Sequence, residues 1–183
     1  MRREFDPDRL DVAAFAEAAA TLSDRDPFSR YRRLAAEAIL APSGDTTVNW
    51  QAEGQQRVAP GGTGAPWLHL QAETGVPLVC QRCLGPVEVP LVVDRWFRFA
   101  VDEATAAAED EDSDEDVLAL GRDFALRALV EDELLMELPV APRHEVCPEP
   151  VRLSAADEDF DTAQEARPSP FAMLDKLRTR KSE

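Results

Sequence analysis

The alternation of apolar and polar residues with a period of two in the middle of the chain restricts the fold more than any other feature. It begins at Thr46 and is typical of half-buried strands. The links between the alternating segments are too short for crossover helices, and the Gly- and Pro-rich stretch 59–66 has no helical pattern. We therefore expect an antiparallel sheet with a loop at 59–66. The predicted strands cover residues 46–51, 67–71, 77–80, 87–93 and 96–101.

Apolar residues at helical spacing lie on both sides of this strand region. Residues 11–22 form the first predicted helix, and the second begins at Asp26, an N-cap residue followed by proline, and ends by Ala41. The clearest apolar stripe covers 123–138, directly before Pro139. The predicted fold class is α+β, an antiparallel β-sheet flanked by helices, with an acidic disordered loop and a flexible C-terminal tail.

The length of 183 residues, of which 44% are hydrophobic, suits one folded domain with tails. We predict a single α+β domain over residues 1–153. An acidic linker and a short C-terminal helix with a basic end follow over 154–183. Phe171 and Leu174 lie on one side of that predicted helix, so they are candidate apolar anchors for a partner.

Acidic residues outnumber basic ones by 36 to 20, and the formal net charge is −16. This charge repels phosphate backbones, which disfavours a protein that coats nucleic acid through a general basic surface. A basic partner, or a local contact with RNA, is left open.

Nine acids and no base lie between residues 102 and 116. Such a run cannot bury apolar area against its ordering entropy, so we expect a disordered, solubilising loop. Attraction of a cationic partner is the alternative role of this run, and Asp110 and Asp112 are then its candidate contacts.

Four potential metal ligands occur in two short motifs. Cys80 and Cys83 form a C-x-x-C turn, and His144 and Cys147 have the same spacing. Together they predict a Cys3His site that binds a structural zinc ion. Because 60 residues separate the two halves, their proximity depends on the tertiary fold. Unliganded structural thiols and redox-active thiols are the alternatives.

Other features of the sequence bear on the class of protein. Three cysteines argue against a disulfide framework, and the charged N-terminus lacks the apolar run of a signal peptide. No stretch approaches the roughly 18 apolar residues of a membrane span. We therefore expect a cytoplasmic protein without membrane contact. Neither H-E-x-x-H nor a P-loop is present, so we expect no enzymatic activity.

The aromatic residues around Trp96 allow two interpretations. Exposed rings beside arginines are typical of a stacking platform for single-stranded RNA. The alternation instead favours Phe97 and Val101 in the core, with Trp96 and Arg98 facing outward. His69 lies within a predicted strand, where we expect a packed or surface histidine rather than a catalytic one.

These motifs, in this order, resemble the YceD family, the large ribosomal RNA subunit accumulation proteins of bacteria and plastids. The resemblance spans most of the chain from about residue 45 onward. Ser169 stands where the family usually has Asn. The matching stretches are Val79–Cys83, Leu129–His144, the nearby Cys147, and Pro170–Leu174.

The resemblance implies a non-enzymatic ribosome biogenesis factor that supports synthesis, processing or stability of 23S rRNA in large-subunit assembly. The net charge of −16 favours the escort of a basic ribosomal component over direct binding to RNA. The expected partner is a precursor of the large ribosomal subunit or a basic ribosomal protein, with direct rRNA contact left open. The alternatives are a zinc-stabilised adaptor unrelated to ribosomes and a thiol- or metal-dependent RNA-processing enzyme.

Overall fold

The computed structural model describes residues 4–39, 46–58, 64–121 and 123–148. The chain divides into two compact units, Met1–Val146 and Cys147–Glu183, and of the second only Cys147 and Pro148 are described. The predicted C-terminal helix with Phe171 and Leu174 lies outside the described residues. So does the predicted boundary between the domain and the linker at residues 153 and 154, which stays a prediction.

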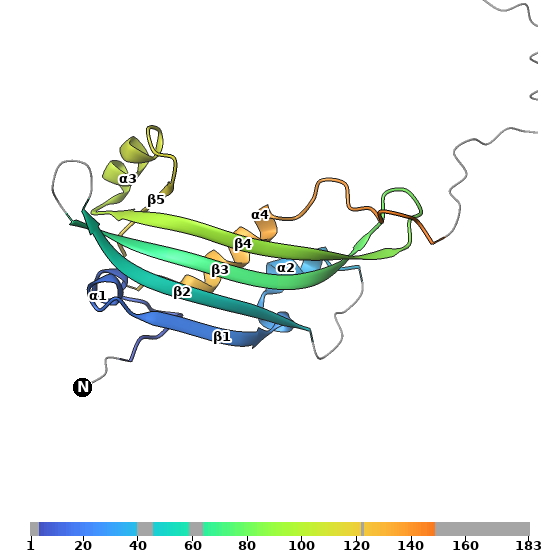
Figure 1. The fold of residues 1–183 in the computed structure, drawn as a ribbon, viewed down its shortest axis with the longest axis horizontal. Helices are drawn as coiled ribbons and strands as arrows, with labels where there is room; N and C mark the ends of the chain where they lie inside the picture. The colour runs from blue at the N-terminus through green and yellow to red at the C-terminus, as the bar shows by residue number, and fades with distance from the viewer. Residues whose placement is uncertain (1–3, 40–45, 59–63, 122, 149–183) are drawn as a thin grey trace, which may run out of the picture. The chain divides into compact units, whose positions relative to one another are not determined.

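A five-stranded sheet forms the centre of the first unit (Figure 1). The strands lie side by side in chain order, and every pair is antiparallel except β4 and β5, which are parallel. The predicted α+β class and the mainly antiparallel sheet are confirmed. The strands are β1 (Thr21–Pro27), β2 (Thr47–Val58), β3 (Gly64–Val79), β4 (Pro86–Ala100) and β5 (Asp116–Ala119).

The predicted strand 46–51 is too short, since β2 continues to Val58, and the last three residues of the predicted loop 59–66 belong to β3. Two pairs of predicted strands merge into the single long strands β3 and β4. The predicted interruption between residues 71 and 77 is absent, and pairing between β2 and β3 ends at Glu73. Pro77 therefore lies beyond the reach of β2, so its missing N–H costs no bond to β2. Its carbonyl oxygen instead accepts a hydrogen bond of 3.0 Å from the Ile39 N–H.

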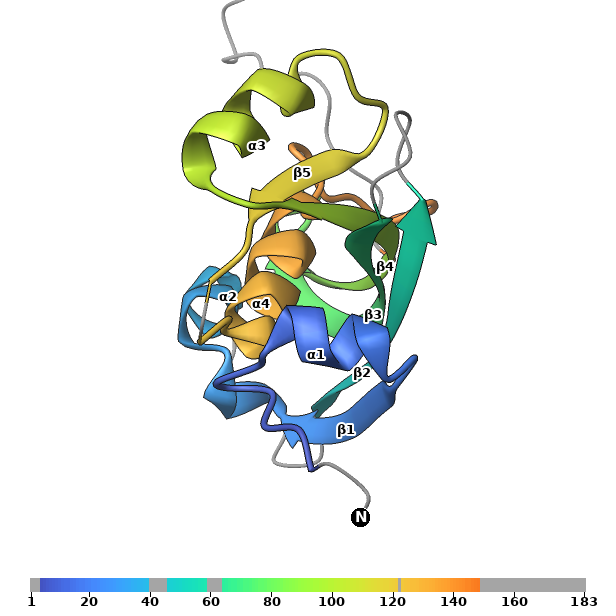
Figure 2. The ribbon, with the colours of Figure 1, turned by 90° about the vertical axis from the view of Figure 1, so that its left-hand side faces the viewer.

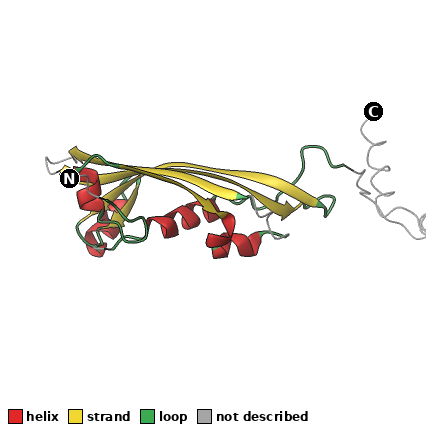
Figure 3. Cartoon of the chain, turned by 90° about the horizontal axis from the view of Figure 1, so that it is seen from below, coloured by secondary structure: helices red, strands yellow, loops and turns green. Residues whose placement is uncertain are grey.

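Helices cover one face of this sheet, as Figure 3 shows. They are α1 (Val12–Glu17), α2 (Arg32–Glu37) and α4 (Leu126–Met136), and a short 3-10 helix, η1 (Phe28–Arg30), precedes α2. Alternate residues of the strands, and residues four apart on α4, are buried. Their side chains therefore form one layer between the sheet and the helices. Its members include Val48, Trp50, Leu68, Leu70, Leu91, Val93 and Phe97 from the strands, and Phe15, Leu34, Leu126, Val130 and Leu134 from the helices.

Figure 2 views the same unit from the end at which α1 crosses β2. A close approach between helix and strand makes a glycine necessary here. A Cβ atom on Gly54 would lie 2.7 Å from Phe15 Cδ1 and 2.8 Å from the Phe15 carbonyl oxygen. The backbone N–H of Gly54 donates a 2.9 Å hydrogen bond to the carbonyl of Ala20, which follows α1. Only glycine lets the strand and the helix come this close.

The two predicted N-terminal helices are wrong in extent. The first ends at Glu17, and Ala19 adopts a left-handed backbone with φ of 45°. The chain then enters β1, which pairs with β2 and includes Asp26, the residue predicted to cap the second helix. Asp26 instead turns its carboxylate into the interior, where Trp50 is one of several donors to it. The second helix therefore begins only at Arg32.

The acidic run 102–116 is not a disordered loop, which corrects the prediction. Residues 103–110 form the helix α3 (Glu103–Asp110), and β5 begins at Asp116. Asp102 caps α3, because its carboxylate accepts a 2.8 Å bond from the Thr105 N–H.

Basic residues from β4 explain why this acidic run folds. Arg98 pairs with Glu109 and donates a 2.8 Å bond to Ser113 Oγ, while Arg95 lies 3.6 Å from Asp116. A small apolar cluster, which includes Ala106, supports the same contact. The basic partners of the run belong to the preceding strand β4, so the sequence of the run itself does not reveal them.

Candidate metal centre

The turn between β3 and β4 carries the first two candidate ligands, Cys80 and Cys83. The Cys80 N–H donates to the Gly85 carbonyl and the Leu84 N–H donates to the Cys80 carbonyl, both at 2.9 Å. Leu84 closes the turn in a left-handed conformation with φ of 59°. The sequence thus folds into a tight hairpin end, in which two thiols separated by two residues share one turn.

The segment that follows α4 brings His144 to this turn. The Gln81 N–H donates a 2.8 Å bond to the Pro142 carbonyl. The Arg82 guanidinium donates to the carbonyls of His144 at 2.5 Å and Glu145 at 3.1 Å. These bonds to backbone carbonyls anchor the second motif against the first, so the ligand side chains do not have to provide that anchoring.

The predicted ligand set comes together in the structure. The ligand atoms of Cys80, Cys83, His144 and Cys147 all lie within 4.8 Å of one another, and the four residues form a group that could hold a metal ion. A tetrahedral zinc ion, with Zn–S of about 2.3 Å and Zn–N of about 2.0 Å, keeps a sulfur and a nitrogen ligand about 3.5 Å apart. The observed separation of Cys83 Sγ from His144 Nδ1 is 3.4 Å.

The imidazole of His144 is oriented by a bond at its other nitrogen. His144 Nε2 lies 3.0 Å from the carbonyl oxygen of Pro86 and donates to it, because a carbonyl can only accept. The proton is therefore on Nε2, and the lone pair of Nδ1 faces the thiol of Cys83. A carbonyl that fixes the tautomer in this way is the usual support of a metal-binding histidine.

The thiol of Cys80 lies in surroundings that favour its ionised form. Cys80 is fully buried, and burial alone raises the pKa of a thiol. Backbone hydrogen bonds from Cys83, Arg82 and His144, with a further bond from the Cys83 side chain, outweigh burial and lower the Cys80 pKa from 9.0 to about 5. A buried thiolate needs a cation, and three sulfur ligands with one imidazole suit a soft, tetrahedral metal.

The other predicted site residues have different roles. Asp110 accepts a 2.9 Å bond from the Val117 N–H, so it serves the link between α3 and β5. Asp112 is exposed, as a residue that meets a partner must be. Neither lies in the metal group.

The aromatic residues of the outer sheet face stack on one another. The rings of Trp96 and His69 are parallel, with centroids 4.3 Å apart, and the Arg57 guanidinium lies 3.7 Å from the centre of the Trp96 ring. His69 also lies 2.6 Å from Asp94, and this hydrogen bond lowers the pKa of Asp94. The Trp96 ring is thus already in contact with an imidazole and a guanidinium, which disfavours the stacking platform for RNA.

The expectation for the alternating residues after Trp96 is partly wrong. Phe97 is buried as predicted, and Trp96 is half-buried. Val101, which was expected in the core, is 73% exposed because it follows the last residue of β4, where the alternation ends.

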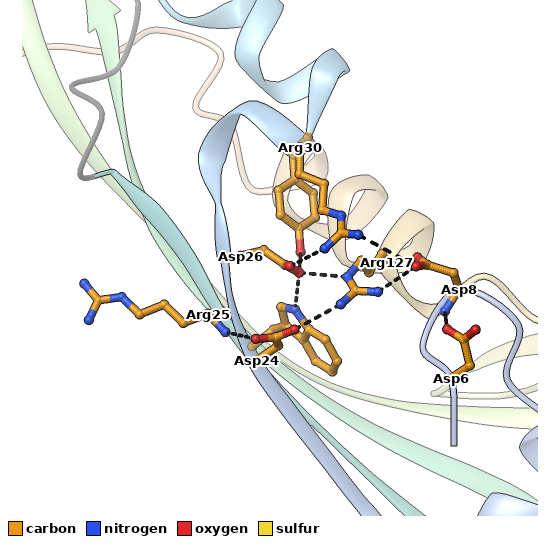
Figure 4. Close-up of polar contacts among 9 residues, drawn as sticks. Asp6, Asp8, Asp24, Arg25, Asp26, Arg30 and Arg127 are labelled. Carbon is orange, nitrogen blue, oxygen red and sulfur yellow. Dashed lines mark hydrogen bonds and ion pairs between the residues drawn. The ribbon is translucent and has the colours of Figure 1, made fainter. Parts of the chain in front are cut away.

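A buried charge network centred on Asp26 is the main feature that the sequence did not suggest (Figure 4). Its carboxylate accepts hydrogen bonds from Trp50 Nε1 at 2.8 Å, Tyr31 OH at 3.0 Å, Arg127 Nε at 2.9 Å and Arg30 at 2.8 Å. Burial alone raises the Asp26 pKa, but these donors outweigh it and lower the pKa to about 2. The network joins β1, β2 and α4, and its role is structural.

Comparison with known proteins bears on the identity of the chain. No helix among the described residues is both long and apolar enough to cross a membrane. No solved structure matches the chain. The model of one family, described as large ribosomal RNA subunit accumulation protein YceD, matches residues 68–178, more than half of the sequence. The matched region includes all four candidate metal ligands and α4. The chain therefore belongs to the YceD family of large ribosomal RNA subunit accumulation proteins.

Proposed function

We propose that this protein is a non-enzymatic, cytoplasmic factor that supports accumulation of 23S rRNA during assembly of the large ribosomal subunit. The observation that carries this proposal is the family match over residues 68–178. We propose further that it acts by holding a basic ribosomal component until that component is incorporated, and that loss of rRNA follows when assembly fails.

A structural zinc ion is part of this proposal. Cys80, Cys83, His144 and Cys147 would hold it, and bound zinc would cross-link the hairpin end to the segment after α4. Four protein ligands complete a tetrahedron and leave no position for a substrate or a catalytic water. The donor set therefore supports a structural role and a non-enzymatic protein.

The distribution of charge supports a basic protein as partner. The chain carries a net charge of −16, which repels rRNA at long range and attracts a cationic protein. Helix α3 and the residues that follow it hold many of these acids in an ordered, exposed segment, Asp112 among them. Carboxylates in an ordered segment keep fixed positions and present a constant electrostatic field to a partner. Carboxylates in a disordered run would not.

Deletion of the gene tests the proposed function. We expect a lower ratio of 23S to 16S rRNA, and accumulation of large-subunit precursors in a sucrose gradient. A wild-type copy supplied in trans is the control and should restore both. Normal gradients and a normal rRNA ratio, under slow growth as well as fast, would refute the proposal.

Affinity purification separates the two classes of direct partner. The full chain is used as bait at low and high salt, and both protein and RNA are identified in the eluate. We expect a basic ribosomal protein that is retained after ribonuclease treatment and lost at high salt. Recovery of rRNA alone, with no protein retained after ribonuclease treatment, would contradict the escort of a basic component.

A further inference from the structure

Strand β4 has a free edge over most of its length. Strand β5 pairs only with residues Phe97–Ala100, so residues 86–96 have no strand neighbour on that side among the residues that the structure describes. A free edge presents a row of unpaired peptide groups that an additional strand can bind.

The register shows which peptide groups face this edge. The carbonyl of Ala100 accepts a bond from Leu120, and that of Pro86 accepts one from His144, so both carbonyls point away from β3. Pairing of β4 with β3 is continuous from Pro86 to Arg98. Alternate residues therefore face the same way. Within residues 86–95, the N–H groups on the free edge belong to Glu88, Val92 and Asp94, because Pro86 and Pro90 have none.

A groove runs beside the first part of this edge. Its volume is about 670 Å³, within the range of about 300–1,000 Å³ that is usual for ligand sites. Val87, Val89 and Pro90 line the strand side, and Pro139, Pro142 and Val146 line the opposite wall. That wall is held in place by the bonds from Gln81 and Arg82 described above.

The groove is mostly apolar and open to solvent. Val146, on its wall, is 84% exposed, and Val89, on the strand side, is half-buried. Exposed apolar side chains that rim a groove are typical of a surface that binds a partner. Alternate residues of an added strand would place their side chains on these valines.

The charges in the groove, and those farther along the free edge of β4, both favour a cationic occupant. The groove itself is lined by two carboxylates, Glu88 and Glu145, against the single guanidinium of Arg143. Farther along, Arg95 is shared by three carboxylates: those of Asp116 at 3.6 Å, and of Glu133 and Glu137 at 3.4 Å each.

One of these carboxylates also lacks a donor. Glu133 is 9% exposed, and its Oε2 has an ion pair with Arg95 but no hydrogen bond among the described residues. A buried carboxylate oxygen in this state favours an additional cationic donor. The excess of carboxylates and the missing hydrogen-bond donor to Glu133 both favour a cationic occupant.

We propose that the free edge of β4 and this groove bind an extended segment of a basic protein. The segment adds a strand beside β4, with apolar side chains on the groove valines and lysines or arginines toward the carboxylates. From Glu88 to Asp94 the edge offers about 20 Å, enough for a bound strand of about seven residues. The inference rests on the proposed function, because it names where the basic component is held.

The test uses the full chain and a defined probe, a peptide of about eight residues that alternates valine and lysine. Its counterpart, with glutamate in place of lysine, is the control for charge. Hydrogen exchange measured residue by residue should show slower exchange at Glu88, Val92 and Asp94 when the lysine peptide is present. The glutamate peptide should have no effect. Protection confined to other parts of the protein would overturn the proposal.

Two variants of one loop provide a matched pair. Val146→Lys adds a charge to the groove wall, and Val140→Lys adds the same charge at a fully exposed residue of the same segment that does not line the groove. Both change the net charge equally, so long-range electrostatics are matched. We expect Val146→Lys to weaken binding of the lysine peptide at least about tenfold and Val140→Lys less than about twofold. Equal losses would refute the groove as the site.

Two further results separate this inference from the proposed function. A uridine oligonucleotide that protects the same three N–H groups, while the lysine peptide does not, would overturn the protein partner. If the lysine peptide protects nothing while deletion still lowers 23S rRNA, the inference fails alone. If the peptide protects the edge while deletion leaves 23S rRNA normal, the proposed function fails and the binding site stands.

Discussion

Removal of Arg127 from the buried network around Asp26 should cost the fold far more than removal of an exposed arginine. Arg127 Nε donates to Asp26 at 2.9 Å, and the two side chains are only 13% and 3% exposed. Arg127→Met keeps a long apolar side chain but leaves the Asp26 carboxylate with the donors Trp50, Tyr31 and Arg30. Breaking one side of a buried ion pair costs about 3–5 kcal/mol. Because three donors remain, we expect about 3 kcal/mol.

The pKa of Asp26 measures a related energy, the net stabilisation of its charge by burial and all four donors together. Its value falls from 3.8 to about 2 in the folded protein, and each pKa unit corresponds to about 1.36 kcal/mol. The ionised carboxylate therefore contributes about 2 kcal/mol to stability. Because the folded pKa is the lower one, this contribution is fully present above about pH 5 and is lost as the pH falls from about 4 to 2.

Chemical denaturation at pH 7 and at a series of lower pH values measures both effects. Arg9→Met is the matched control, because Arg9 pairs with Asp123 at 3.1 Å but the two side chains are 71% and 59% exposed. Such a pair is worth about 0–1 kcal/mol. Asp26→Asn should lose stability at pH 7, and the difference from the wild type should shrink below about pH 4. A cost for Arg127→Met no greater than for Arg9→Met, or a difference for Asp26→Asn that does not change with pH, would refute this reasoning.

The remaining predictions concern the metal centre, the packing of α1 and the acidic segment. Protein purified without chelators should contain about one zinc ion per chain, and Cys83→Ser or a chelator should lower the melting temperature; metal-free protein with an unchanged melting curve would contradict this. Gly54→Ala should destabilise the fold by about 1–3 kcal/mol in urea titrations, because the added Cβ atom meets the phenylalanine of α1 at 2.7 Å. Gly121→Ala, where nothing lies within 4 Å, is the control and should cost less than about 1 kcal/mol. Asp112→Asn, combined with neutralisation of its exposed acidic neighbours, should slow association with the basic partner and flatten its salt dependence in stopped-flow measurements. An unchanged rate at every salt concentration would count against an electrostatic role. Asp110→Asn should instead lower stability, because the Asp110 carboxylate holds the Val117 N–H.

Local patterns in the sequence were sufficient to locate the strands β2, β3 and β4 and the helix α4, but not to give the full length of the strands. Period two places Val48 and Trp50 on the same face of β2, and a spacing of four places Val130 and Leu134 on the same face of α4. Each pattern lies within one strand or helix, so it can be recognised without knowing which other elements pack against it. The C-x-x-C motif and the His144–Cys147 spacing are equally local, so the ligand types could be predicted.

Only the tertiary structure decided the contacts between distant segments. The residues around Asp26 predict a helix cap. Its partner Arg127 is 101 residues away, and the buried ion pair between them keeps Asp26 in a strand. The acids at 102–116 read as unpaired because the bases that order them, Arg95 and Arg98, come from β4.

The metal centre has both kinds of determinant. Each half is a local motif, but Cys83 and His144 are 61 residues apart in the chain. Their proximity comes from backbone bonds of Gln81 with Pro142 and from the guanidinium of Arg82. A pattern within a few residues determines which element forms and which face is apolar. Which distant charges and ligands meet depends on how the elements pack, because burial makes an unpaired charge too costly to leave without a partner.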